Sequence, residues 1–207
     1  MKKHQILLSA ILSGLCVGFG GIVYLSLDNK VIGSALFTIG LFVICTFGLH
    51  LFTGKVCYLF QNDRDYALTL PIIWFGNLVG TGLTAGCTLL TRNAVAVSER
   101  AMSLCQIKLN DSLLSLFFLG VLCNIFIYLA VEGFRSNPHE LGKYLSLFFG
   151  VMVFILSGTE HCVADMFYFW IAKAWSGRAL LCILVISLGN AFGGILFATL
   201  HRYLKKA

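Results

Sequence analysis

Residues 48–55 read Gly-Leu-His-Leu-Phe-Thr-Gly-Lys, and residues 157–165 read Ser-Gly-Thr-Glu-His-Cys-Val-Ala-Asp. Each of these polar stretches interrupts a long apolar segment near its middle, and the two lie in corresponding halves of the chain. Unwound polar backbone inside a membrane span is tolerated only where protein buries it or where it lines a cavity. A matched pair of such breaks is the best sequence indicator of a transporter's substrate site. The pattern therefore predicts a membrane protein that moves a solute, with its site at the two breaks.

The composition is that of a membrane protein. Hydrophobic residues make up 58% of the chain and charged residues 12%, against roughly 25% charged residues in a typical soluble domain. Apolar regions long enough to cross ~30 Å of hydrocarbon have the approximate bounds 5–28, 31–61, 69–91, 112–133, 142–174 and 178–202. We therefore predict an all-α membrane protein with six transmembrane helices that forms a single transmembrane domain over residues 1–207. Since no loop is long enough for a catalytic domain, we expect no enzyme activity, catalytic residues, metal site or cofactor.

Positive charge at the two chain ends predicts the orientation. Lys2 and Lys3 begin the chain, and Arg202, Lys205 and Lys206 end it, so we expect both termini to be cytoplasmic in a multi-pass protein of the cytoplasmic membrane. The first apolar stretch is longer than the ~7–15 residues of a signal-peptide core, so we expect an uncleaved span. The net charge of +6 includes no dense basic patch, which argues against nucleic acid as a partner. The eight cysteines form no Cys-x-x-Cys pair and are expected to act as small hydrophobic residues.

An internal repeat supports the same plan. Residues 76–80 (Gly-Asn-Leu-Val-Gly) are echoed 113 positions later by residues 189–193 (Gly-Asn-Ala-Phe-Gly), and we expect the same offset to relate the two breaks. Three spans followed by three similar spans point in opposite directions, because an odd number of crossings reverses the chain. We therefore predict an inverted 3+3 repeat, about residues 5–91 and 112–202, with the site where the repeats meet. Looser counterparts in the first spans are Gly14 and Gly18 in one repeat and Gly120 and Asn124 in the other.

The asparagines of the repeated motif and the residues beside the breaks have separate expected roles. The motif glycines allow close helix packing, while Asn77 and Asn190 are expected to hydrogen-bond to the unwound backbone. His50 and Lys55 flank the first break, and Lys55 is expected to extend toward the cytoplasmic interface.

Several side chains in the breaks are candidates for contact with a solute. The N-terminal end of each second half-helix carries unpaired N–H groups and a partial positive charge, which attract an anion. His161 is the leading candidate, because an ionisable residue within a span is functional by default and imidazole exchanges a proton near neutral pH. Thr53 either caps the following half-helix or contacts the solute. Glu160 is expected to accept backbone hydrogen bonds or to pair with His161, and Asp165 to cap the second half-helix. Lys108 either raises the electrostatic potential at the outer mouth or is a solvated loop lysine.

The motifs together resemble one known family. Residues 157–167, which continue the second break with Met-Phe, resemble the signature of the formate/nitrite transporter family, in which Gly-x-Glu-His precedes Ala-Asn-Met. Residues 51–54 are similar to that family's first broken-helix loop, residues 119–124 and 129–131 to its fourth span, and residues 189–194 to its sixth. The resemblance implies an aquaporin-like six-helix protomer, a homopentamer with one pore in each subunit, and passage of small monovalent anions such as formate, nitrite, hydrosulfide or short carboxylates.

The resemblance also implies roles for individual residues. By position, Thr53 matches the family's loop threonine, His161 its central histidine and Lys108 its vestibule lysine. Asp165 stands where the family usually has asparagine, and His50 where some members carry aspartate. The pore asparagines correspond to Asn124 and Asn190, and the apolar constrictions to Phe37, Leu41, Leu51, Phe52, Ile127 and Phe154.

These observations lead to a mechanistic hypothesis. A bare anion that crosses an apolar constriction meets a desolvation cost of several kcal/mol, which protonation of a weak acid largely removes. We expect Lys108 and the half-helix ends to gather the anion, a proton from His161 or from bulk water to join it near His161, and the neutral acid to pass the phenylalanines. The preferred anion and the choice between a passive channel and a proton-coupled carrier stay open.

Two other classes of protein are alternatives. A neutral-solute channel for water, ammonia or glycerol would share the inverted repeat, but the sequence has no Asn-Pro-Ala motif. A membrane enzyme or assembly factor would need clustered nucleophiles, metal ligands or a large exposed loop, which the sequence does not provide.

Overall fold

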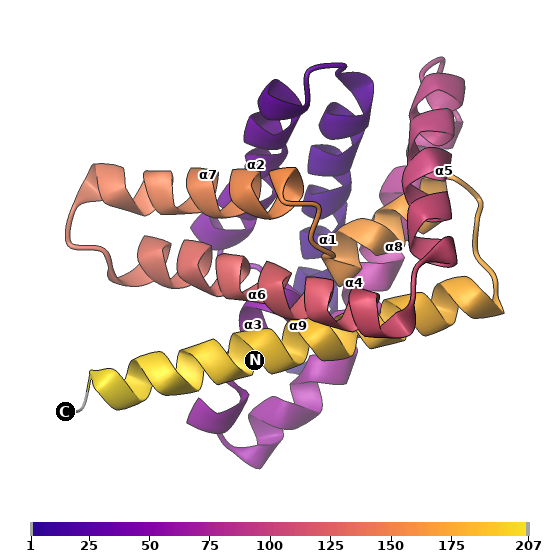
Figure 1. Ribbon diagram of the computed structural model, residues 1–207. Helices are drawn as coiled ribbons and strands as arrows, with labels where there is room; N and C mark the ends of the chain where they lie inside the picture. The colour runs from indigo at the N-terminus through magenta and orange to yellow at the C-terminus, as the bar shows by residue number, and fades with distance from the viewer. Residues whose placement is uncertain (1, 206–207) are drawn as a thin grey trace.

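The computed structural model describes residues 2–205, which are helical apart from short connections (Figure 1). The helices in chain order are α1 (Lys3–Ser26), α2 (Lys30–Thr46), α3 (Phe52–Val56), the short 3-10 helix η1 (Leu59–Gln61), α4 (Arg64–Leu89), α5 (Ala94–Asn110), α6 (Leu113–Ser136), α7 (Glu140–Leu156), α8 (Cys162–Ile171) and α9 (Gly177–Leu204). The expected all-α class is confirmed.

Four helices are long and apolar enough to cross a membrane by themselves, namely α1, α4, α6 and α9. The other two predicted apolar regions are each divided. Residues 31–61 contain α2, α3 and η1, and residues 142–174 contain α7 and α8. The helices therefore break within the two polar stretches that the sequence indicated.

Both breaks begin with the same helix-ending turn. Gly48 follows α2 and Gly158 follows α7, and each has a φ of +65°, which favours glycine because it has no Cβ. The next amides reach back into the helix they leave, with Leu49 N–H donating to Ile44 O at 2.9 Å and Thr159 N–H donating to Phe154 O at 3.2 Å. This pattern is the Schellman motif. The two glycines therefore end their helices at equivalent places.

Asn77 of α4 holds the first break. Its Oδ1 accepts from the backbone N–H of Phe52 at 2.8 Å, and its Nδ2 donates to the carbonyl oxygens of Ala10 at 2.8 Å and His50 at 3.0 Å. One buried side chain thus satisfies backbone groups on both sides of the break and joins them to α1. The expected role of Asn77 is confirmed.

Asn190 of α9 makes the matching bonds at the second break. Its Oδ1 accepts from Cys162 N–H at 3.0 Å, and its Nδ2 donates to the carbonyl oxygens of Gly120 and Glu160, both at 2.8 Å. Its expected bracing role is confirmed as well.

The matching contacts correct the expected offset. Phe52 and Cys162, which occupy equivalent positions, lie 110 residues apart, whereas Asn77 and Asn190 lie 113 apart. The expectation of 113 for the breaks is wrong, because the second half of the chain has three more residues between its half-helix and its last helix. With the offset of 110, the counterpart of Gly14 is Asn124 rather than Gly120.

Glycines bring α1 close to α4 and α6 close to α9. A Cβ on Gly80 of α4 would lie 2.1 Å from Ile11 O, and one on Gly193 of α9 would lie 2.1 Å from Val121 O. Such contacts leave no room for a methyl group, since both neighbours are backbone atoms. The expected packing role of the repeated glycines is therefore confirmed at these two positions.

We predict that Gly80→Ala lowers the stability of the protein by about 1–3 kcal/mol, because the added methyl forces two helices apart. Thermal unfolding of the purified protein in detergent measures the effect. Gly86→Ala is the matched control in the same helix, because a Cβ there has no atom within 4 Å. The close-packing interpretation fails if the two variants unfold at the same temperature.

The helix α5 was not predicted, since residues 92–111 were expected to form a loop. Its buried residues are Val97, Ala101, Cys105 and Lys108, which share one face of a helix because they recur every three or four positions. That face packs against α8. The unpredicted helix thus carries Lys108 into the interior.

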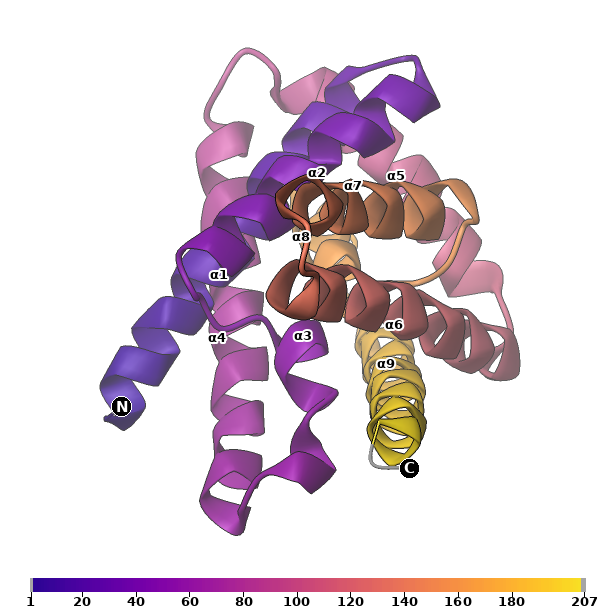
Figure 2. The ribbon, with the colours of Figure 1, turned by 90° about the vertical axis from the view of Figure 1, so that its left-hand side faces the viewer.

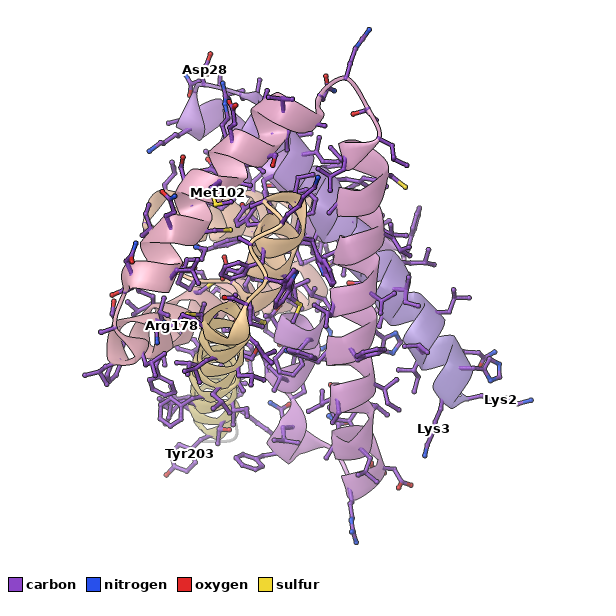
Figure 3. The ribbon with its side chains drawn as sticks, turned by 90° about the vertical axis from the view of Figure 1, so that its right-hand side faces the viewer. Lys2, Lys3, Asp28, Met102, Arg178 and Tyr203 are labelled. Atoms are coloured by element: carbon purple, nitrogen blue, oxygen red, sulfur yellow. The ribbon has the colours of Figure 1, made fainter. Side chains whose placement is uncertain are left out.

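Both ends of the described part of the chain lie on the same side of the molecule (Figure 2). Lys205, next to the end of α9, has its Nζ 3.8 Å from Glu132 Oε1 near the end of α6. The connection between α3 and α4 returns on this side too (Figure 2). Asp28, in the turn after α1, lies at the opposite end of the molecule from Tyr203 (Figure 3). We call the first side the terminal side and the second the Asp28 side.

Candidate functional site

The N-terminal ends of the two half-helices meet in the interior. Thr53 Oγ1, in the first turn of α3, lies 3.0 Å from Nε2 of His161, which immediately precedes α8. Thr53 is 0% exposed and His161 4% exposed. The two leading candidate residues, which are 108 positions apart in the sequence, therefore form one hydrogen-bonded pair.

The hydrogen bonds of His161 define its tautomer. The backbone N–H of Ala164 donates to His161 Nδ1 at 3.1 Å, so Nδ1 carries a lone pair. In the neutral imidazole the proton is then on Nε2, and this N–H donates to Thr53 Oγ1. The hydroxyl hydrogen of Thr53 stays available for an acceptor in the passage. The pair can thus present the O–H of Thr53 to a solute, and the N–H of His161 as well when the bond between the two side chains opens.

Two expectations about capping are wrong. His161 itself caps α8 through Nδ1, whereas the amide of Asp165 donates to His161 O at 2.9 Å inside the first turn. Thr53 does not cap α3 either, because the cap position is occupied by Leu51, which makes no side-chain cap bond. Of the two interpretations of Thr53, the cap is therefore excluded. Contact with a solute stays a prediction.

A buried charged triad lies beside His161. Lys108 Nζ is 2.6 Å from Glu160 Oε2 and 3.2 Å from Asp165 Oδ1. The exposed fractions are 7%, 5% and 2% for Lys108, Glu160 and Asp165. Of the two interpretations of Lys108, the solvated loop lysine is wrong, because α5 folds over α8 and buries the side chain. Glu160 pairs with Lys108 rather than with His161, so that expectation is also corrected.

Asn124 of α6 links the two breaks. Its Nδ2 donates to Thr53 O at 3.1 Å and to Asn190 O at 2.7 Å. Its Oδ1 is buried and has no hydrogen-bond partner among residues 2–205. Both asparagines therefore lie beside the breaks, and their role in a pore stays a prediction. The amide of Asn190 is already bonded to backbone, whereas Asn124 keeps a free acceptor.

Aromatic and aliphatic side chains surround the pair. The ring of Phe154 stacks on His161 with 5.5 Å between centroids, and Phe37 meets Phe154 edge-on at 6.2 Å. The predicted constriction residues are all buried, namely Phe37, Leu41, Leu51, Phe52, Ile127 and Phe154. This apolar surrounding removes water from the pair, which makes a bare anion costly there.

A cavity of about 750 Å³ opens from the first break toward the terminal side. Leu41 and Leu51 lie at its inner end, and Lys55, Tyr58 and Arg135 line it. We call this cavity the vestibule. Its residues from the end of α6 were not predicted. The sequence signal that could have indicated them was Arg135, which lies in the last turn of an apolar span.

Nearly the whole chain matches one known family. The sequence model of the family described as formate/nitrite transporter matches residues 1–204. The chain belongs to the formate/nitrite transporter family. The resemblance noted in the motifs is therefore confirmed. The family consists of transporters and not of enzymes. Its members similar to this chain include nitrite transporters and formate channels, which does not favour the alternative of a neutral-solute channel.

Comparisons with individual relatives and solved structures support this membership of the formate/nitrite transporter family. The nitrite transporter NirC of Salmonella typhimurium is 29% identical over 91% of this chain and 78% of its own length. A solved structure described as an ion channel of the same family is 28% identical, with a TM-score of 0.81 over 97% of this chain and 90% of that one. A pentameric formate channel with formate bound, at 24% identity, has a TM-score of 0.84 over 99% of this chain and 97% of that one, which shows the shared fold.

Proposed function

We propose that this protein transports small monovalent anions of weak acids, with formate and nitrite as substrates, across the cytoplasmic membrane. The observation that carries the proposal is the Thr53–His161 pair, where two half-helix N-termini meet in an apolar interior. The O–H of Thr53, joined by the N–H of His161 when their mutual bond opens, gives two donors at one place, which suit a small oxyanion. Family membership and the nitrite transporter NirC among the relatives support the same substrates. Hydrosulfide and short carboxylates are alternative substrates of the same site.

The proposal includes a particular architecture, in which six spans form a single transmembrane domain with an inverted 3+3 repeat in an aquaporin-like fold. The matching bonds of Asn77 and Asn190 support the repeat, because each ties a break to the first helix of its own half. Both chain ends on one side suit an even number of spans, and Lys2 and Lys3 suit a cytoplasmic N-terminus. The pentameric formate channel of similar fold supports a homopentamer with one passage in each subunit.

In the proposed mechanism the anion is protonated before it crosses the apolar rings. An oxyanion that enters from the vestibule accepts a hydrogen bond from Thr53 Oγ1. It accepts a second from His161 Nε2 when it displaces Thr53 as the acceptor of that N–H. A proton then joins one anion oxygen to give the neutral acid, which removes most of the several kcal/mol of desolvation cost. The proton comes either from bulk water or from an imidazolium form of His161. That form arises when Nδ1 gains a proton, which breaks the bond from Ala164 N–H, and it returns to the neutral imidazole when it protonates the anion. The neutral acid passes Phe37 and Phe154 and loses its proton on the far side.

Uptake into proteoliposomes tests the function. Labelled formate and nitrite are offered with and without an inward proton gradient, beside a panel of other small anions and of water and glycerol. We expect formate or nitrite uptake above that of empty liposomes, with faster uptake under the inward gradient. Water or glycerol flux without anion flux would overturn the proposal.

We predict that Thr53→Val lowers the rate of formate uptake by about 10- to 100-fold, because valine keeps the shape but removes the acceptor of His161 Nε2–H and one donor to the anion. Thr53→Ser keeps the hydroxyl and is expected to retain most of the rate. The comparison uses initial uptake rates at equal amounts of reconstituted protein. Equal rates in the two variants would exclude the hydroxyl from the passage.

A further inference from the structure

The vestibule contains two cationic side chains that form no salt bridge. Within residues 2–205, neither Lys55 nor Arg135 has a carboxylate oxygen within 4 Å. Both side chains line the cavity of about 750 Å³. The guanidinium carbon of Arg135 lies 4.8 Å from the ring centroid of Tyr58. This stacking holds the arginine by its face and leaves its N–H groups free for an anion.

The one carboxylate that lines the vestibule within the described residues has other partners. Glu132 Oε2 accepts from Tyr58 Oη at 2.8 Å, and Oε1 accepts from Ser136 Oγ at 3.0 Å. Lys205 Nζ approaches Glu132 Oε1 to 3.8 Å. The oxygens of Glu132 are therefore satisfied by hydrogen bonds, and Lys205 is the one described cation within 4 Å of them. Because two cations and one carboxylate line the cavity, it keeps a net positive charge.

Charge on the Asp28 side of His161 is arranged in the opposite way. Lys108 faces two carboxylates, Glu160 and Asp165, and all three groups are buried. Its positive charge is thus balanced where it lies. Two arginines on this side are also occupied, since Arg100 pairs with Asp28 and Arg178 donates to the backbone oxygens of Leu109 and Asp111. Further cations without a salt bridge among the described residues are exposed and do not line the vestibule, including Lys30, Arg92 and Lys173.

We propose that Lys55 and Arg135 form an anion-binding site in the vestibule and that anions are captured mainly from the terminal side of the channel. The proposal rests on the proposed function and adds a residue pair and a direction to it. The ligand class is the small oxyanion, carboxylate or nitrite, whose oxygens match the guanidinium and ammonium donors. Charges of one sign that line a cleft raise the local concentration of the opposite charge.

The proposal predicts that the apparent affinity for the anion differs between the two sides of the protein, while the equilibrium distribution of the anion across the membrane does not change. In a passive passage the final distribution of the anion is unaffected, because both directions share one path. The concentration that gives half-maximal flux is expected to be lower when the anion is supplied from the terminal side. The difference is expected to shrink in concentrated salt, where the Debye length falls to about 3 Å.

The test uses proteoliposomes in which the protein faces one way, with formate supplied from one side at a time. The variants Lys55→Gln and Arg135→Gln remove the charges, and Lys55→Arg and Arg135→Lys keep them. We expect the two glutamine variants to raise the half-saturating formate concentration on the terminal side about tenfold and to leave the Asp28 side unchanged. The charge-keeping variants are expected to resemble the wild type.

Lys143→Gln is the matched control, because Lys143 lies at the start of α7, outside the vestibule, and pairs with exposed Glu140 at 2.8 Å. It is expected to change neither side. Wild-type flux that saturates equally from both sides, or glutamine variants that shift both sides alike, would overturn this inference alone. A wild-type protein that carries no anion from either side would overturn the proposed function, and this inference with it.

Discussion

His161→Asn is expected to lower formate and nitrite uptake by at least about tenfold, in the range found when a positioned acid–base group is removed, and to weaken its acceleration by an inward proton gradient. The amide can replace Nδ1 as the cap of α8, since asparagine is among the preferred N-cap residues. It cannot take or give a proton near neutral pH. The variant therefore separates the structural role of the histidine from its role in transport. Initial uptake rates as a function of external pH give both quantities.

His139→Asn serves as the control for this variant. His139 also precedes a helix, α7, but makes no side-chain cap bond and is exposed. It is expected to leave both the rate and its pH dependence unchanged. If His161→Asn behaves in the same way as His139→Asn, the imidazole has no part in the mechanism.

Lys108→Met is expected to destabilise the protein by about 3–5 kcal/mol, because it leaves two buried carboxylates without their ammonium partner. Lys108 Nζ lies within 3.2 Å of oxygens from both Glu160 and Asp165, so no nearby group replaces it. Thermal unfolding in detergent measures the loss, which we expect to exceed the loss caused by Gly80→Ala.

A triple variant provides the matched test of this explanation. Lys108→Met combined with Glu160→Gln and Asp165→Asn removes all three charges at similar volume, and we expect it to recover most of the lost stability. Should the triple variant unfold as easily as Lys108→Met, the loss comes from packing and not from unpaired charge. A stable single variant would show that the triad contributes little.

The breaks were predictable because the physical rules that produce them act locally. Polar residues inside an apolar run cannot face lipid, so the backbone there must be held by protein. Gly48 and Gly158 end their helices by a positive φ, which a glycine adopts readily. The asparagine that satisfies each break could be recognised as well, because it lies in a motif that occurs once in each half.

The residues that were wrongly placed depend on contacts between distant segments. The one local signal of burial for Lys108 was its helical spacing from Val97, Ala101 and Cys105, and its charge partners lie 52 and 57 positions further along the chain. Asp165 was expected to cap α8 because aspartate favours that position. His161 occupies the cap instead, and Asp165 points to the lysine of α5. The position of the Asp165 side chain was therefore decided by a charge partner, Lys108, outside its own segment.

The vestibule pair escaped prediction for a similar reason. Lys55 and Arg135 belong to different halves of the chain, and each alone is typical of a basic residue near a membrane interface. Only the fold shows that they line one cavity without a carboxylate partner in the described residues.

The most direct measurement is a cryo-EM or crystal structure of the protein in high nitrite or formate. We predict density for one anion within hydrogen-bond distance of Thr53 Oγ1 and His161 Nε2, between the N-termini of α3 and α8. Anion density only at other places, with the Thr53–His161 bond intact and the site closed to the vestibule at every anion concentration, would contradict the proposed passage.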